Sequence, residues 1–198
     1  MQPIHSLALT GGPSGGKSTL IRAVAEQVPE AYYAPEVATM LLSGGFPAPS
    51  LKHPWDESWQ IDLQQGIAGT QLALENIARR RAIKEGKRLV IFDRGIIDGA
   101  AYLPNGIFDL ESMTGLTEEE MLRRYNTVLH LASTAISGSY DKQSNPHRFE
   151  EAEEALKLED MTLEAWQNHP SRIILKDADK QIKISKGLSY IKNLINVE

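Results

Sequence analysis

The sequence contains no cysteine among its 198 residues. Disulfide bonds, zinc sites built on thiolates and a cysteine nucleophile are therefore excluded as sources of stability or of chemistry. Long apolar runs are also missing, because no stretch approaches the roughly 18 to 20 residues that span a bilayer. The segment Met1 to Leu9 lacks the basic start and the long apolar stretch of a secretory leader. These absences predict a soluble, cytoplasmic protein that does not bind membranes.

An excess of positive charge is lacking too, because 21 Lys and Arg stand against 26 Asp and Glu, for a formal net charge of -5. Proteins that bind nucleic acids usually cluster Lys and Arg on one face. The run Arg79 to Arg81 is interpreted as the solvated end of a helix, so we expect no nucleic-acid partner. Chain length and an apolar content of 41% suit one domain over residues 1–198. The oligomeric state stays open.

Segments with strand character alternate with segments of helical periodicity along the chain. Ser6–Thr10 is a β-prone run before a glycine cluster, and Arg88–Phe92 is a continuous apolar run of the kind buried on both faces of a parallel sheet. Further strands are predicted over Ala31–Ala34, Thr127–Leu131 and Arg172–Leu175, and helices over Lys17–Val28, Glu36–Gly44, Asp56–Lys84, from Thr117, Phe149–Trp166 and Ala178–Asn193. This alternation predicts a three-layer α/β fold with a mostly parallel, five-stranded sheet.

The glycine cluster fits the phosphate-binding pattern G-x-x-x-x-G-K-S/T in full, and it lies between a predicted strand and a predicted helix. In such a loop the backbone N–H groups curl around phosphates, and the helix dipole adds positive charge. Lys17 should bridge the β- and γ-phosphates, and the Ser18 hydroxyl should bind Mg2+. The residues expected to bind ATP or a similar triphosphate are Gly11, Gly12, Pro13, Ser14, Gly15, Gly16, Lys17, Ser18 and Thr19. The alternative is a glycine-rich turn with an incidental lysine.

Asp93 stands at the carboxyl end of the third predicted strand, followed directly by Arg94. A carboxylate at this place commonly holds Mg2+ through the water shell of the ion, although an aspartate there can also cap the following turn. Arg94 is a candidate for contact with substrate or phosphate. A surface ion pair explains an arginine there with comparable weight.

Glu36 follows the second predicted strand and should face the crevice at the carboxyl edge of the sheet. It is our candidate for the group that orients an acceptor hydroxyl and takes its proton. A glutamate at the start of a helix is also common because of the helix dipole, and the two interpretations have similar weight.

The long predicted helix and the stretch before it contain Trp55, Trp59, Gln60, Gln64 and Gln71, with the glutamines at roughly helical spacing. One interpretation is that these side chains line a pocket for an acceptor. We favour the other, in which Trp59 packs in the core and the glutamines are solvated.

Residues from about 133 to 150 are polar enough for a lid over the phosphates. Arg148 is the best cation in it for the transferring phosphoryl group. Arg123 and Arg124 are weaker candidates, because a helix C-terminus attracts arginine for dipole reasons alone. No metal-ligand spacing is found among the histidines, and structural roles are expected for His130, His147 and His169.

Taken together, these segments resemble the P-loop family of nicotinamide riboside kinase-like proteins, which is classified among AAA-type ATPase domains. The resemblance covers nearly the whole chain and rests on GGPSGGKST, APEVATMLLSGG, FDRGIIDGAAYLP, NPHRFEEAEEA and WQNHP. It implies a nucleoside-kinase-like fold, ATP and Mg2+ at Gly11 to Thr19 with Asp93, and a lid that carries Arg148. The pair Asp93 and Arg94 resembles a pair in nucleoside and nucleotide kinases whose arginine contacts substrate or phosphate.

The leading functional hypothesis is a kinase that transfers the γ-phosphoryl group of ATP to a hydroxyl of a nucleoside-like or other small metabolite. A regulatory GTPase is disfavoured, because the sequence has no N-K-x-D stretch for guanine after a late strand. An ATP-binding regulatory module or a slow ATPase without an acceptor stays open. The acceptor itself is not determined by the sequence.

Overall fold

The computed structural model describes residues 4–133 and 152–196. Its centre is a sheet of five strands: β1 (His5–Thr10), β2 (Ala31–Ala34), β3 (Leu89–Asp93), β4 (Thr127–Leu131) and β5 (Arg172–Leu175). Their order is β2-β3-β1-β4-β5, and every neighbouring pair is parallel. The predicted fold class is confirmed. The carboxyl ends of all five strands therefore meet at one edge of the sheet.

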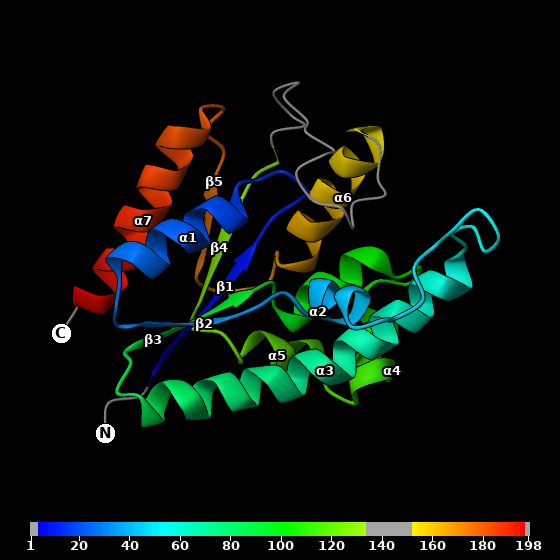
Figure 1. Ribbon diagram of the computed structural model, residues 1–198, viewed down its shortest axis with the longest axis horizontal. Helices are drawn as coiled ribbons and strands as arrows, with labels where there is room; N and C mark the ends of the chain where they lie inside the picture. Colours follow the sequence, from blue (N-terminus) through cyan, green and yellow to red (C-terminus); the bar gives the residue numbers. More distant parts are fainter. Residues whose placement is uncertain (1–3, 134–151, 197–198) are drawn as a thin grey trace.

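Helices cover both faces of the sheet (Figure 1). On one face lie α1 (Lys17–Gln27) and α7 (Lys180–Asn196), and on the other lie α3 (Glu57–Lys84), α4 (Ile107–Thr114) and α5 (Glu118–Leu122). Alternation along β1 divides the core, because successive side chains of a strand point to opposite faces. Leu7 and Leu9 pack with α1 and α7, whereas Ala8 packs on the α3 side.

Two elements follow Asp93 that the sequence did not reveal. A 3-10 helix, η1 (Ile96–Tyr102), and then α4 occupy the stretch before Thr117. Six consecutive residues of η1, from Ile96 to Ala101, are buried. Because burial on all sides erases the period of an amphipathic helix, the pattern of apolar residues gave no signal here.

The long helix α3 begins where the sequence predicted, and the Asp56 side chain caps it by accepting a hydrogen bond from the Trp59 N–H at 2.7 Å. The favoured interpretation of its polar residues was wrong. Gln64 and Gln71 are 4% and 3% exposed, so they are buried rather than solvated. Trp59 is only half-buried and packs edge-on against Phe46, with ring centroids 6.3 Å apart.

The remaining helices are α2 (Val37–Ser43), which follows β2, and α6 (Ala152–Ala165), which precedes β5. The predicted bounds of these two helices agree with the structure to within a few residues. Within the described ranges, no helix combines the length and the apolar character that crossing a membrane requires.

Candidate active site

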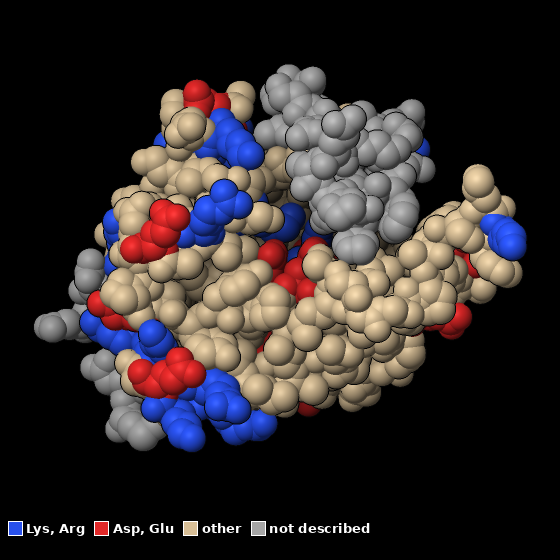
Figure 2. Space-filling view, viewed as in Figure 1, with Lys and Arg blue, Asp and Glu red and all other residues tan. Residues whose placement is uncertain are grey.

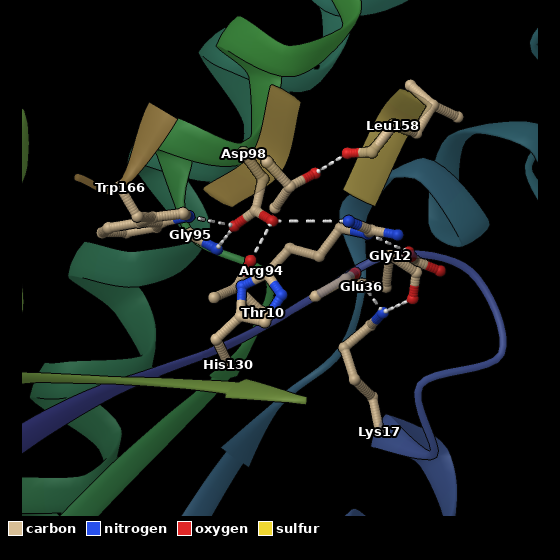
Figure 3. A network of polar contacts seen from close by, with 12 residues as sticks. Thr10, Gly12, Lys17, Glu36, Arg94, Gly95, Asp98, His130, Leu158 and Trp166 are labelled. Carbon is tan, nitrogen blue, oxygen red and sulfur yellow. Dashed lines mark hydrogen bonds and ion pairs between the residues drawn. The ribbon is translucent and has the colours of Figure 1, made fainter. Parts of the chain in front are cut away.

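The site lies at the carboxyl edge of the sheet, where the loop after β1 joins α1 (Figure 3). β1 is the central strand, and its two neighbours, β3 and β4, come later in the chain on either side of it. Open parallel sheets bind ligands at such a point, because the loops of adjacent strands separate there. We call residues Gly11 to Ser18 the phosphate loop.

The phosphate loop needs glycine where it passes close to β4. Gly11 has a φ of +128°, and a Cβ on it would lie 2.1 Å from the carbonyl oxygen of Leu131. No side chain fits there. Gly16 has a φ of +100° at the start of α1, a conformation that glycine adopts without a steric penalty.

Lys17 is the cation of the loop. Its Nζ donates hydrogen bonds to the carbonyl oxygens of Gly11 at 2.7 Å and Gly12 at 3.0 Å (Figure 3). Desolvation lowers the pKa of Lys17 to about 8, with a contribution from the nearby charge of Arg94. A phosphate group beside this amine would restore its charge. Ser18 and Thr19 follow in the first turn of α1, where both are exposed.

Asp93 ends β3 and is 8% exposed. Its Oδ2 accepts a hydrogen bond from the Tyr33 hydroxyl at 3.2 Å. Its Oδ1 is buried and has no hydrogen-bond partner among the described residues. Desolvation raises the pKa of Asp93 to about 6, and the charge of Glu36 adds to the increase. An incompletely paired carboxylate oxygen fits a role in holding the water shell of Mg2+.

Glu36 and Arg94 come from the ends of β2 and β3 and form an ion pair (Figure 3). Arg94 Nε lies 2.7 Å from Oε1 of Glu36, and the Thr39 hydroxyl donates to Oε2 at 2.6 Å. Burial alone would raise the pKa of Glu36, but Arg94 and the Thr39 hydrogen bond outweigh it and lower the pKa. Glu36 is the N-cap residue of α2, yet its side chain does not cap the helix.

Arg94 is held from several sides. It has a φ of +69°, which is uncommon for a residue with a side chain. Its carbonyl accepts from the Gln71 side chain at 3.1 Å, its guanidinium carbon lies 5.8 Å from the centre of the Tyr102 ring, and its Nη1 lies 3.4 Å from Asp98 Oδ1. The interpretation of Arg94 as a surface ion pair does not fit this environment.

Asp98 is a site residue that the sequence analysis missed. It is 3% exposed, and its Oδ2 accepts from the Gly95 N–H at 2.9 Å and from Trp166 Nε1 at 3.2 Å. The Thr10 hydroxyl donates to its Oδ1 (Figure 3). One signal in the sequence could have revealed it, because Asp98 is the single charged residue in the apolar stretch GIIDGAA. A carboxylate that is buried in such a stretch needs hydrogen-bond partners, which makes it a candidate site residue.

Several other candidates lie away from the site or outside the described residues. Arg123 is exposed and pairs with Glu119. Arg124 pairs with the buried Glu75 of α3 at 2.7 Å. Arg148, His147 and nearly all of the predicted lid lie outside the described residues. His169 Nε2 is 3.0 Å from the Tyr125 carbonyl oxygen, a structural contact as expected.

The described residues contain no group of three or more His, Asp or Glu side chains arranged to hold a metal ion by themselves. Mg2+ in nucleotide sites commonly has only one or two protein ligands, with water and phosphate completing the shell. Figure 2 shows acidic and basic side chains next to one another in a recess at the middle of the face in view.

A parallel sheet, a complete phosphate loop and a carboxylate at the end of β3 define a nucleotide-binding protein of the P-loop class. A family model described as an AAA domain matches residues 6–180, and the chain belongs to this family. The resemblance found in the sequence is confirmed in family and fold. A search of curated proteins gave no significant match.

Solved structures with the same fold include NadR protein in complex with NR, with a TM-score of 0.71 at 16% identity. NadR protein in complex with NAD and AMP-PNP has a TM-score of 0.67, also at 16% identity. Both matches cover 99% of this chain but only 53% and 51% of the solved chains. This chain therefore spans about half the length of those proteins.

Proposed function

We propose that this chain is a kinase that uses ATP and Mg2+ to phosphorylate a hydroxyl group of a small, nucleoside-like metabolite. The observation that carries the proposal is the pair of Glu36 and Arg94 in electrostatic reach of Lys17 and Asp93. A nucleotide-binding loop alone needs no such pair. An acceptor does, because its hydroxyl must be oriented toward the γ-phosphate.

Each residue then has a role. The loop N–H groups and Lys17 bind the β- and γ-phosphates. Mg2+, held by Ser18 and by Asp93 through water, would neutralise charge on the phosphate oxygens. Glu36 accepts the hydrogen bond of the acceptor hydroxyl, and Arg94 contacts the acceptor or the transferring group. Arg148 remains the proposed lid cation.

The lowered pKa of Glu36 makes it a weak base, and this affects how it would act. In phosphoryl transfer the bond to the leaving group is largely broken before the acceptor proton moves, so positioning matters more than basicity. An ionised carboxylate that accepts one hydrogen bond and is itself fixed by Arg94 and Thr39 suits such positioning. We therefore propose an orienting role for Glu36, with proton transfer following.

Nucleoside-like acceptors are proposed on two grounds. The family resemblance implies a nucleoside-kinase-like protein, and one structural neighbour is described in complex with NR. A neighbour described in complex with NAD and AMP-PNP, an ATP analogue, supports a triphosphate at the loop.

The decisive experiment incubates the purified chain with ATP and Mg2+ and a panel of nucleosides that includes NR, with sugars and nucleotides for comparison. A kinase forms ADP only with an acceptor, and mass spectrometry finds phosphorylated acceptor in equal amount. ADP and inorganic phosphate that form at the same rate without any acceptor would instead establish the slow ATPase or regulatory module.

A further inference from the structure

Glu159 of α6 contacts the phosphate loop, although the proposed reaction does not use it. Its Oε2 accepts hydrogen bonds from the Gly12 N–H at 2.7 Å and from the Ser133 N–H at 3.1 Å. Its Oε1 lies 2.8 Å from Nε2 of His130 in β4. One carboxylate thus joins the phosphate loop, the end of β4 and α6.

The carboxylate is deeply buried, at 1% exposure, and His130 is 0% exposed. Burial by itself would raise the pKa of Glu159, but its bonds to His130 and to the Gly12 and Ser133 N–H groups outweigh this and lower the pKa. A buried carboxylate costs free energy unless its partners satisfy it. Three hydrogen bonds, to the phosphate loop, to β4 and to the residues directly after β4, satisfy this carboxylate.

The approach of Glu159 to the loop is close enough to restrict the sequence there. A Cβ on Gly12 would lie 2.4 Å from Glu159 Oε2 and 3.2 Å from Glu159 Cβ. A second hydrogen bond fixes the loop next to the Glu159 contact: the Ser133 hydroxyl donates to the Pro13 carbonyl oxygen at 2.5 Å. The first residues of the phosphate loop are therefore fixed from the side of β4 and α6.

We propose that Glu159 is a positioning residue for the nucleotide: it holds Gly12 and Ser133 so that the following N–H groups of the phosphate loop are already arranged for phosphate. The consequence for affinity rests on the proposed binding of ATP. If the loop samples the competent arrangement only a fraction of the time, the apparent affinity falls by that fraction. Glu159 raises the fraction without touching the nucleotide.

Two variants test this role, Glu159→Ala and Glu159→Gln, with Thr162→Val as the matched control. Thr162 is buried on the same helix, and its hydroxyl donates to the Leu158 carbonyl oxygen at 2.6 Å within α6. The control removes a buried hydrogen bond from α6 but none from the loop. Affinity for ATP with Mg2+ is measured by calorimetry, and exchange of the Gly12 amide proton by NMR in the ligand-free protein.

We expect Glu159→Ala to weaken ATP binding by about tenfold, which corresponds to a loop that is competent about a tenth of the time, and to speed exchange of the Gly12 amide. Glu159→Gln should fall between, because its amide oxygen can still accept from the Gly12 and Ser133 N–H groups but lacks the negative charge that strengthens these hydrogen bonds. Thr162→Val should match the wild type in both measurements.

Unchanged affinity in folded Glu159→Ala would overturn the proposal, and Glu159→Gln decides in the same way if the alanine variant does not fold. An equal loss in Thr162→Val would reduce the effect to destabilisation of α6 and overturn it too. A wild-type chain that binds no triphosphate would refute the proposed function, and the positioning role with it; that failure is seen in the wild type, before any variant is compared.

Discussion

Arg94 and Glu36, 58 positions apart in the sequence, form an ion pair with 2.7 Å between Nε and Oε1. The pair joins the ends of two adjacent strands, β2 and β3. Because both side chains are largely shielded from solvent, the pair fixes a carboxylate oxygen at the crevice. Its position next to the phosphate loop makes Glu36 the most informative residue to change.

Glu36→Gln should leave ATP affinity within about twofold of wild type and reduce acceptor-dependent turnover by roughly 10²- to 10⁴-fold, the usual range for loss of a general base or its orienting role. Calorimetry and the coupled assay separate binding from turnover. Glu26→Gln, an exposed change on α1, is the control. Normal turnover in Glu36→Gln would remove Glu36 from the active site.

Lys17→Ala should abolish most ATP affinity while the protein stays folded, because within residues 4–133 and 152–196 the amine donates only to two loop carbonyls. The control is Lys87→Ala, which removes a similar hydrogen bond to the Pro29 carbonyl oxygen at the opposite edge of the sheet. Thermal unfolding checks the fold of both variants. Wild-type affinity in Lys17→Ala would contradict the assignment of the phosphate loop.

ATP binding should also take up protons near pH 8. The pKa of Lys17 is lowered to about 8 in the ligand-free protein, so about half of the amines are neutral at that pH. Phosphate favours the charged form and raises the pKa, which draws in up to about 0.5 proton per ATP bound. Calorimetry in buffers of different ionisation enthalpy measures this uptake. Equal enthalpies in all buffers at pH 8 would count against it.

Asp93→Asn should lower turnover and change its titration with Mg2+, yet stabilise the ligand-free protein at pH 8. The pKa of Asp93 is raised from 3.8 to about 6 in the folded protein. The folded state therefore holds a proton on Asp93 more tightly than the unfolded state does, and the protein loses stability as the pH rises from about 4 to about 6. Two pH units correspond to about 3 kcal/mol, an upper value for the gain of the asparagine variant. Below about pH 4 the variant and wild type should unfold alike. A variant less stable than wild type at pH 8 would refute this account.

Asp98→Asn should destabilise the protein by about 1–3 kcal/mol. The carboxylate of Asp98 now accepts hydrogen bonds with both oxygens, whereas the NH2 group of an asparagine side chain would point a donor at other donors. The affected donors are the Gly95 N–H and Trp166 Nε1. Denaturant unfolding measures the loss. The control is Asp109→Asn, because the half-buried Asp109 accepts hydrogen bonds from Asn105 alone among the described residues. Equal free energies of unfolding for the two variants would show that the hydrogen bonds of Asp98 do not make the proposed contribution to stability.

The strands could be predicted from the sequence because each is a short apolar run with a turn residue near its end. Ala31–Ala34, Thr127–Leu131 and Arg172–Leu175 were predicted with the bounds that the structure has. The phosphate loop was equally clear, since its glycines, Lys17 and Ser18 are consecutive. These signals are local, because each depends only on residues that are consecutive in the chain.

The sequence by itself determined the α/β class, the phosphate loop and the strand-end carboxylate. Only the tertiary structure decided that Gln64 and Gln71 are buried, that Arg94 meets Glu36 and Asp98, and that Glu159 meets Gly12 across 147 positions. The physical reason is that a polar side chain has no periodic preference that reveals its partner. Such a side chain is either exposed to water or hydrogen-bonded inside the protein. The outcome depends on which segments the fold places beside it, here the strand ends that meet at one edge of the parallel sheet.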